Sequence, residues 1–189
     1  MKRLAVYCGS APGNDPAFAD MARSMEAEMI SQGIDLVYGG GRLGLMGIVA
    51  DAVLNAGGKA YGVIPRSLVD LEVAHPGLTE MHIVTTMHER KAKMTELTDA
   101  FVALPGGIGT LDELFEAWTW NALGFHAKPF ALLNVNGFWD GLDTFMDKVV
   151  ASGFLSGARR EQLLMAHSPA EAIKLLDEAS ASAAQGMVW

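Results

Sequence analysis

The sequence predicts a single doubly wound α/β domain with a mainly parallel sheet. Short apolar runs alternate along the chain with segments whose apolar residues recur at helical spacing. Helices between the strands provide the crossover connections that parallel strands require. The 189 residues suffice for one domain, and we find no internal repeat and no linker. We therefore expect one domain over residues 1–178 and a flexible tail over residues 179–189, which begins with an Ala- and Ser-rich run.

The expected strands are short apolar runs, several of which end at a glycine or a proline. They cover residues 4–8, 34–38, 59–64, 83–85, 100–104 and 129–135. Residues 66–80, between the third and fourth strands, show little regular pattern and are expected to form a long loop with one short turn. Long loops inside compact domains are often functional, so we expect this loop to lie near a ligand.

The expected helices follow the strands in turn. Asp15 followed by Pro16 predicts an N-cap and a first helical residue, and Gly33 marks the end of that helix. The remaining helices are expected over residues 44–55, 88–98, 110–123, 138–152 and 169–183. This order of elements places the loops that lead from strands into helices at one edge of the sheet, where doubly wound domains bind ligands.

Composition excludes several classes of protein. With 22 acidic and 14 basic residues the net charge is −8, which argues against a general nucleic-acid or membrane-surface binder. Half of the residues are apolar and only 19% are charged, so the chain is not of the disordered class. The single cysteine, Cys8, excludes an internal disulfide and a multi-thiolate metal site. Apolar runs are too short for a signal peptide or a membrane span, so we expect a cytoplasmic protein.

The run Gly39-Gly40-Gly41-Arg42-Leu43-Gly44 fits the pattern G-x-G-x-x-G between a strand and a helix. A dinucleotide site is poorly supported, because the run follows the second strand and Lys59 stands where an acid is expected. Leu45 occupies the position of the P-loop lysine, which excludes a Walker A site. Two interpretations stay open: a cradle for an anionic ligand, or a tight turn without a ligand.

The segment from Pro105 to Glu113 is the more specific signal. Three glycines in four positions allow the main chain to approach a ligand closely, and the start of the helix with the Thr110 hydroxyl suits one phosphate group. Thr110 and Glu113 also fit a capping box, in which Glu113 would be structural. Alternatively, Glu113 is a carboxylate beside a bound sugar phosphate, where it stabilises an oxocarbenium-like cation or orients water.

The helix expected from residue 88 begins with three residues that can be positive: His88, Arg90 and Lys91. Positive charge is unfavourable at a helix N-terminus unless an anion lies there. We therefore place Arg90 in the site as a forked donor, with a solvated surface charge as the alternative. The helix expected over residues 110–123 is apolar on more than one face, which predicts either deep burial or a dimer contact.

Three spaced motifs together closely resemble the LONELY GUY family of cytokinin riboside 5′-monophosphate phosphoribohydrolases, whose members are often labelled lysine decarboxylases. The motifs are the Gly39–Gly47 segment, Met87-His88-Glu89-Arg90-Lys91, and the segment from Pro105 to Glu113. The resemblance implies a homodimer or larger oligomer of Rossmann-like subunits with no metal or redox cofactor. It also implies hydrolysis of the N-glycosidic bond of a cytokinin (N6-modified adenine) riboside 5′-monophosphate, which gives the free base and ribose 5-phosphate.

By motif, the resemblance implies that Arg90 and Glu113 are the catalytic pair. The residues that it places against the nucleotide are Gly106, Gly107, Gly109 and Thr110 at the 5′-phosphate, Lys91 beside them, and Ser10, Gly40 and Glu72 as further contacts. This chain has Ile108 and Asp112 where relatives often carry Tyr and Glu, and neither change alters the glycine–threonine–glutamate skeleton.

Three other functions remain open on the sequence alone. An AMP nucleosidase would differ only in the base that its pocket accepts. A non-catalytic nucleotide or molybdenum-cofactor carrier could use the same fold. A pyridoxal-phosphate decarboxylase would need a Schiff-base lysine such as Lys59 or Lys91, but the chain shows no recognisable signature for that cofactor.

Overall fold

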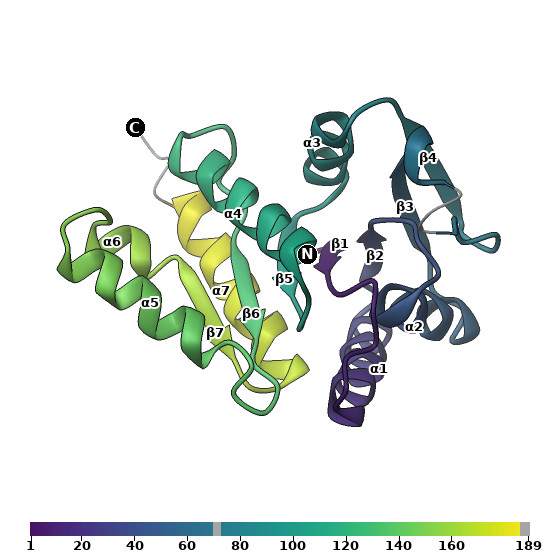
Figure 1. The fold of residues 1–189 in the computed structure, drawn as a ribbon, viewed down its shortest axis with the longest axis horizontal. Coiled ribbons are helices and arrows are strands. Elements are labelled where there is room, and N and C mark those ends of the chain that lie inside the picture. Colours follow the sequence, from purple (N-terminus) through teal and green to yellow (C-terminus); the bar gives the residue numbers. More distant parts are fainter. Residues whose placement is uncertain (70–72, 186–189) are drawn as a thin grey trace.

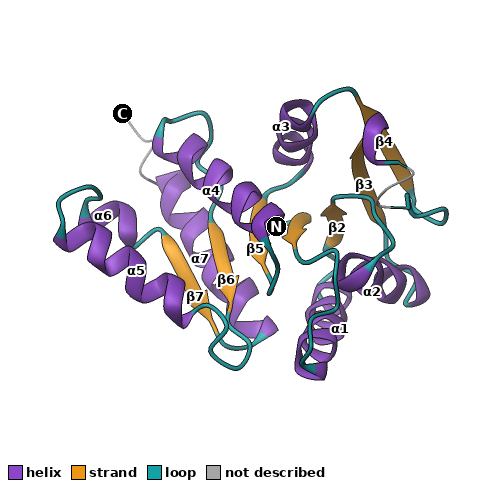
Figure 2. Cartoon of the chain, viewed as in Figure 1, coloured by secondary structure: helices purple, strands orange, loops and turns teal. Residues whose placement is uncertain are grey.

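The structure is a computed structural model that describes residues 1–69 and 73–185. Its centre is a parallel sheet with the strand order β4-β3-β2-β1-β5-β6-β7 (Figures 1 and 2). The strands are β1 (Arg3–Tyr7), β2 (Asp35–Tyr38), β3 (Ala60–Pro65), β4 (Glu80–Val84), β5 (Ala100–Ala103), β6 (Phe130–Leu133) and β7 (Leu163–Ala166). Every pairing between neighbours is parallel, which confirms the predicted fold class.

Helices cover both faces of the sheet (Figure 2). One face packs against α1 (Pro16–Ser31), α2 (Gly44–Asn55) and α7 (Pro169–Gln185). The other packs against α3 (Met87–Leu97), α4 (Ile108–Ala122) and α5 (Asp140–Ala151). Two short helices complete the described chain, the 3₁₀ turn η1 (Arg66–Leu68) and α6 (Gly157–Arg160). Within residues 1–69 and 73–185, no helix combines the length and the apolar character needed to cross a membrane.

The central strand β1 shows why the apolar runs are strands. Leu4 and Val6 belong to the core on the α1 side, and Ala5 and Tyr7 belong to the core on the α4 side. Side chains of a strand alternate between faces, so a strand that is covered on both faces is apolar at every position. All four side chains are almost completely buried. The two cores thus share β1, which fixes the position of the loop that follows it.

The chain reverses its direction across the sheet between β1 and β5. From β1 the chain runs through β2 and β3 to one edge, and from β5 it runs through β6 to the other. In doubly wound sheets such a switch point opens a crevice at the carboxyl ends of the two strands. Here the two following loops touch, because the Gly9 amide donates to the Pro105 carbonyl at 3.1 Å. The fold therefore places the first and the fifth strand loops at one site.

Most predicted elements are present, with differences at the edges of the sheet. Helix α2 has the predicted bounds, and Asp15 caps α1 through a hydrogen bond from the Ala17 amide. The prediction missed β7 and α6, which are only four residues long and lie at the last edge of the sheet. Helix α7 continues to Gln185 and so includes part of the segment assigned to the tail. The flexibility of residues 179–189 stays a prediction.

Candidate active site

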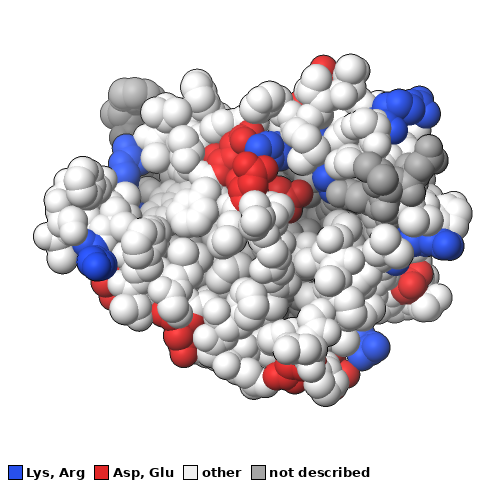
Figure 3. Space-filling model, viewed as in Figure 1, with Lys and Arg blue, Asp and Glu red and all other residues white. Residues whose placement is uncertain are grey.

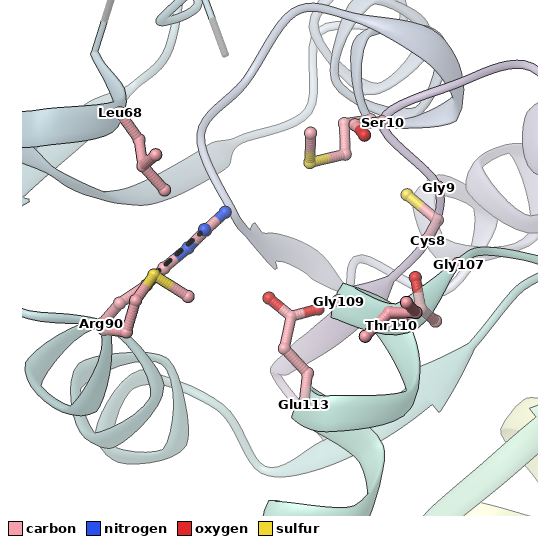
Figure 4. Close-up of a pocket in the computed structure, with 12 residues that line it drawn as sticks. Cys8, Gly9, Ser10, Leu68, Arg90, Gly107, Gly109, Thr110 and Glu113 are labelled. Atoms are coloured by element: carbon pink, nitrogen blue, oxygen red, sulfur yellow. Dashed lines mark hydrogen bonds between the residues drawn. The ribbon is translucent and has the colours of Figure 1, made fainter. Parts of the chain in front are cut away.

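A pocket of about 220 Å³ lies at the switch point of the sheet (Figure 4). The loop after β1, the loop after β5, the first turns of α3 and α4, and single residues of α2 and η1 surround it. The lining residues are Cys8, Gly9, Ser10, Met46, Leu68, Met87, Arg90, Gly107, Ile108, Gly109, Thr110 and Glu113. Both residues of the predicted catalytic pair, Arg90 and Glu113, therefore face one cavity.

Arg90 is a buried cation that the protein holds in place. Its side chain comes from the first turn of α3 and is only 4% exposed. Nη2 donates to the carbonyl oxygen of Gly39 at 3.0 Å. A side chain at Gly39 would collide with this group, because a Cβ built there lies 2.1 Å from Nη2. The surface-charge alternative for Arg90 is therefore wrong, and Gly39 is required for the placement of the guanidinium.

The glycine run after β2 forms a tight turn that packs on the loop after β1. The Leu45 and Met46 amides at the start of α2 donate to the Gly9 carbonyl at 3.0 and 3.3 Å, so the chain itself occupies these donors. Gly44 has a φ of +58°, and a Cβ there would lie 2.3 Å from the Ser10 carbonyl carbon. The run thus packs closely on the loop after β1. Of this run and the start of α2, Met46 lines the pocket.

Gly40, predicted as a nucleotide contact, holds the neighbouring loop instead of lining the pocket. Its carbonyl accepts a hydrogen bond from the His75 amide at 2.9 Å, and Gly41 pairs with Ala74 in an isolated β-bridge. The His75 ring adds a contact to Asp51 of α2 at 3.0 Å. These contacts attach the end of the long loop to the glycine run.

The start of α4 presents backbone donors to the pocket. The helix begins at Ile108 with Gly107 as its N-cap, and no side chain caps it. The amides of the first turn have no acceptor within the helix, and together with the helix dipole they suit an anion. Thr110 is 3% exposed, and its hydroxyl lies against Gly106, where a Cβ would come within 2.1 Å of Oγ1. Gly106 therefore allows Thr110 to sit beneath the loop.

The capping-box interpretation of Thr110 and Glu113 is wrong. Because α4 begins two residues earlier than predicted, Thr110 lies inside the first turn and is not the N-cap. Glu113 lies one turn further along and points into the pocket beside Arg90 (Figure 4). The structural alternative for Glu113 is thereby removed, and its carboxylate lies where a bound molecule would meet it.

Glu113 also affects the groups below it on the central strand. Burial and then the Glu113 carboxylate raise the pKa of the Cys8 thiol well above its ordinary value, and the same two causes raise the pKa of the Tyr7 hydroxyl. A thiol with a raised pKa is a poor nucleophile at neutral pH. Cys8 therefore lines the pocket as an uncharged thiol.

Lys91 follows Arg90 in the chain but does not line the pocket. Its ammonium donates to Asp112 Oδ2 at 2.9 Å and to Oδ1 at 3.2 Å, and it also donates to Glu116 Oε2. Burial opposes the charge on Lys91, but the hydrogen bonds to Glu116 and Asp112 outweigh it and raise the pKa of the ammonium. The Glu116 side chain is largely buried.

Figure 3 shows the charges around this ion pair. Acidic side chains gather between α3 and α4, and a basic side chain lies among them. Among the described residues no group of three or more histidine, cysteine, aspartate or glutamate side chains is arranged to hold a metal ion.

Known proteins give the family of this chain. A family model described as "Possible lysine decarboxylase" matches residues 46–176. The cytokinin riboside 5′-monophosphate phosphoribohydrolase LOG1 of Arabidopsis thaliana is 46% identical over 177 residues, which cover 94% of this chain and 83% of LOG1. The LOG enzyme of Oryza sativa subsp. japonica, which carries the same activity name, is 46% identical over 188 residues, 100% of this chain and 78% of that protein. The chain belongs to the LOG family.

Solved structures confirm the fold. The X-ray structure of TM1055 has a TM-score of 0.72 at 26% identity and covers 94% of this chain and 99% of its own. The molybdenum cofactor carrier protein of Chlamydomonas reinhardtii has a TM-score of 0.72 at 20% identity, with 96% of this chain and 99% of that chain covered. At this identity the carrier shares the architecture, and the likeness extends to the fold alone.

Some residues of the LOG-family motifs line the pocket, and others support it from behind. Among the predicted site residues, those that line the pocket are Ser10, Arg90, Gly107, Gly109, Thr110 and Glu113. Gly40, Gly106 and Lys91 lie behind that lining, where they hold a loop, a threonine and a helix. Glu72 lies outside the described residues.

Apolar lining residues are the part of the site that the sequence interpretation missed. Leu68, Met46, Met87 and Ile108 line the pocket together with the polar groups. Met46, Met87 and Ile108 lie inside the three motifs, but the motifs were interpreted through their glycines and charged residues. Leu68 comes from η1 in the unpatterned loop, and nothing in its local sequence distinguishes it.

The environments of Lys91 and Lys59 test the pyridoxal-phosphate decarboxylase alternative, which the description of the family model also suggests. A Schiff-base lysine needs a neutral amine, and the raised pKa of Lys91 keeps its amine protonated. Lys59 is exposed just before β3, at the amino end of that strand and so at the opposite edge of the sheet from the pocket. Neither lysine has the environment that Schiff-base chemistry requires.

Proposed function

We propose that this LOG-family chain hydrolyses the N-glycosidic bond of a cytokinin riboside 5′-monophosphate and releases the free base and ribose 5-phosphate. One observation carries the proposal: Arg90, Glu113 and the first turn of α4 line a single pocket. Relatives that are 45–46% identical over nearly the whole chain are named as phosphoribohydrolases for this substrate class.

The 5′-phosphate would bind at the start of α4. Gly107 and Gly109 leave the backbone open, since a Cβ at either position would meet nothing within 4 Å. The first-turn amides, the buried Thr110 and the exposed Ser10 across the pocket would surround the phosphate oxygens. Binding the remote phosphate orients the ribose, so the reacting carbon is placed without further contacts.

Glu113 and Arg90 would act on the ribosyl centre from two sides. Hydrolysis of an N-glycosidic bond develops positive charge on the ribose ring, and a carboxylate held beside the ring stabilises that charge or directs the attacking water. The Arg90 guanidinium, held by Gly39, would anchor the nucleotide and assist departure of the base. Neither step requires a metal or a redox cofactor.

The apolar part of the lining favours a base with an apolar N6 substituent. Leu68, Met46 and Met87 add apolar surface to the lining of the pocket. An unmodified adenine would lose the contact with these side chains, so an AMP nucleosidase is the less favoured of the two activities.

The family resemblance and the exposed apolar residues near α4 support a homodimer. Leu123 is 65% exposed and Phe125 is 73% exposed, although both are large apolar side chains. A second copy of the chain would remove them from water. The homodimer and the cytoplasmic location stay predictions.

Product analysis tests the activity. Isopentenyladenosine 5′-monophosphate, AMP and the two matching nucleosides are incubated with the protein, and free base is measured by chromatography. We expect the modified nucleotide to react fastest and both nucleosides to react poorly, because they lack the phosphate. Equal turnover of nucleotide and nucleoside would contradict the phosphate anchor. Stoichiometric binding of nucleotide without any release of base would favour a carrier.

Glu113→Gln tests the role of the carboxylate. We expect turnover to fall roughly 10²- to 10⁴-fold, the range for loss of a positioned acid–base group, while the melting temperature stays near that of the wild type. Glu96→Gln is the matched control, because Glu96 is an exposed acid of α3 that pairs with Lys93. Wild-type turnover by a folded Glu113→Gln protein would refute the assignment.

A further inference from the structure

Lys91 joins the two helices that carry Arg90 and Glu113. Its side chain is only 7% exposed, and its three N–H donors meet three oxygens of α4, two on Asp112 and one on Glu116. Asp112 and Glu116 are one helical turn apart, so they form one acceptor site that faces α3. The contact is therefore a bridge between α3 and α4.

The bridge and the catalytic pair occupy the same helical turns. Lys91 is the neighbour of Arg90 on α3, and Asp112 is the neighbour of Glu113 on α4. Successive residues of a helix point about 100° apart. When Lys91 points at α4, its neighbour Arg90 is directed into the pocket. When Asp112 points at α3, its neighbour Glu113 is likewise directed into the pocket. Rotation of either helix would break the bridge and move a catalytic side chain away from the pocket.

The two carboxylates of the bridge need the positive charge of Lys91 between them. One ammonium faces two carboxylates, and Glu116 Oε1 is buried without a hydrogen-bond partner among the described residues. Without the ammonium, the largely buried Glu116 carboxylate would lose its partner and would repel the carboxylate of Asp112. Their repulsion would displace the first turns of α4, which include Glu113.

We propose that Lys91 is a positioning residue, whose ion pairs with Asp112 and Glu116 hold α3 and α4 so that Arg90 and Glu113 face the same substrate. The inference deepens the proposed function and rests on it. It differs from the phosphate contact implied by the family resemblance, because the ammonium donates to carboxylates and lies outside the lining of the pocket.

Three variants distinguish positioning from phosphate binding: Lys91→Met, Lys91→Arg and the double variant Asp112→Asn/Glu116→Gln. The measurements are kcat and KM for isopentenyladenosine 5′-monophosphate and the Kd of ribose 5-phosphate by calorimetry. We expect Lys91→Met to lower kcat at least tenfold, with KM and Kd changed less than threefold. Lys91→Arg should recover part of kcat, because it retains the charge.

The double variant is the decisive one. It keeps Lys91 but removes the acceptors, so positioning predicts a loss of kcat similar to that of Lys91→Met. Lys93→Met is the matched control, since Lys93 forms a more exposed pair with Glu96 on the same helix and should leave kcat unchanged. Should Lys91→Met not fold, Asp112→Asn replaces it, because half of the Asp112 side chain is in solvent.

The outcomes separate this inference from the function on which it rests. A tenfold rise in KM and in the Kd of ribose 5-phosphate with kcat retained would make Lys91 a phosphate ligand and overturn the proposal. Full kcat in the double variant would also overturn it. Absence of turnover by the wild-type protein would instead refute the proposed function, and with it this role of Lys91.

Discussion

At Gly39 there is no room for a side chain, because the Arg90 guanidinium occupies that space. The colliding atom is the end of a flexible side chain, so Gly39→Ala should move the guanidinium rather than unfold the protein. We expect kcat/KM to fall roughly 10²-fold, the loss that a displacement of about 1 Å can cause, with little change in melting temperature. Steady-state kinetics measures the fall in kcat/KM, and thermal unfolding measures the melting temperature.

Gly141→Ala is the control for this variant. Gly141 lies inside α5, where a Cβ would meet nothing within 4 Å. Alanine is a better helix former than glycine, so this change should leave kcat alone and stabilise the fold by about 0.5–1 kcal/mol. Wild-type kcat/KM in Gly39→Ala would show that the guanidinium does not depend on the glycine.

Glu26 is a buried acid that the reaction does not use. It lies on α1, is 1% exposed, and neither carboxyl oxygen has a hydrogen-bond partner among the described residues. Burial raises the pKa of Glu26 to about 9. The native state therefore holds a proton that the unfolded chain releases above its ordinary pKa of 4.5. The contribution of Glu26 to the free energy of unfolding should be highest below pH 4.5 and should fall as the pH rises toward 9.

Glu26→Met tests this dependence. Methionine has a similar length and no charge, so we expect a higher melting temperature at pH 8 and a flatter stability profile between pH 5 and 9. The wild type should lose up to about 1.4 kcal/mol per pH unit through this group over that range. Urea unfolding at several pH values measures the slope. Asp20→Asn, at an exposed pair of the same helix, should not alter it, and an equal slope in Glu26→Met would contradict the burial argument.

Among the elements, α3 and α4 show how one local pattern can have two outcomes. At α3, the N-cap Thr86 accepts from the Glu89 amide at 3.1 Å, and Glu89 accepts from the amide of Thr85 at 2.7 Å. This is a variant of the capping box, in which the glutamate bonds the residue before the N-cap. At α4 the same spacing of Thr110 and Glu113 forms none, because Gly107 begins the helix earlier. The glycines before α4 thus place the start of the helix where neither Thr110 nor Glu113 caps it.

The capping box of α3 predicts a measurable stability effect. Thr86→Ala removes the acceptor of the Glu89 amide and should lower the free energy of unfolding by about 1 kcal/mol. The adjacent Thr85 is exposed and provides only its amide to the box, so Thr85→Ala should have little effect. Urea unfolding of the two variants gives the comparison, and equal stabilities would show that the cap contributes nothing.

The sequence predicted elements best where burial makes every residue apolar. The central strands and α2 follow from apolar runs and glycine boundaries. The edge strand β4, in contrast, begins at Glu80 and consists of exposed and half-buried residues. Its prediction over residues 83–85 was therefore too short. At the site, the family resemblance implied Arg90 and Glu113, and the positive charges at the start of α3 indicated Arg90 independently of it. The position of Lys91 relative to the pocket depends on how α3 turns toward α4, which local spacing does not determine.

At the scale of the whole molecule, topology and charge have separate effects. The reversal of direction between β1 and β5 brings together loops that are about 95 residues apart in sequence, as the contact between Gly9 and Pro105 shows. The net charge of −8 repels an anionic substrate in general. In the proposed function, Arg90 and the amides of α4 would supply the attraction, so the pocket rather than the overall surface would bind the nucleotide.

The assembly of the molecule provides the last prediction. Leu123 and Phe125 are exposed beside α4, and a homodimer that buries them should dissociate when both become charged. We expect the wild type to elute as a dimer in size-exclusion chromatography with light scattering, and Leu123→Asp/Phe125→Asp to elute as a monomer. Ile83→Asp is the control, because Ile83 is 45% exposed on the edge strand β4, whereas α4 packs on β1, β5 and β6. A dimer in the double variant would place the interface on another face, and a monomeric wild type would remove the homodimer altogether.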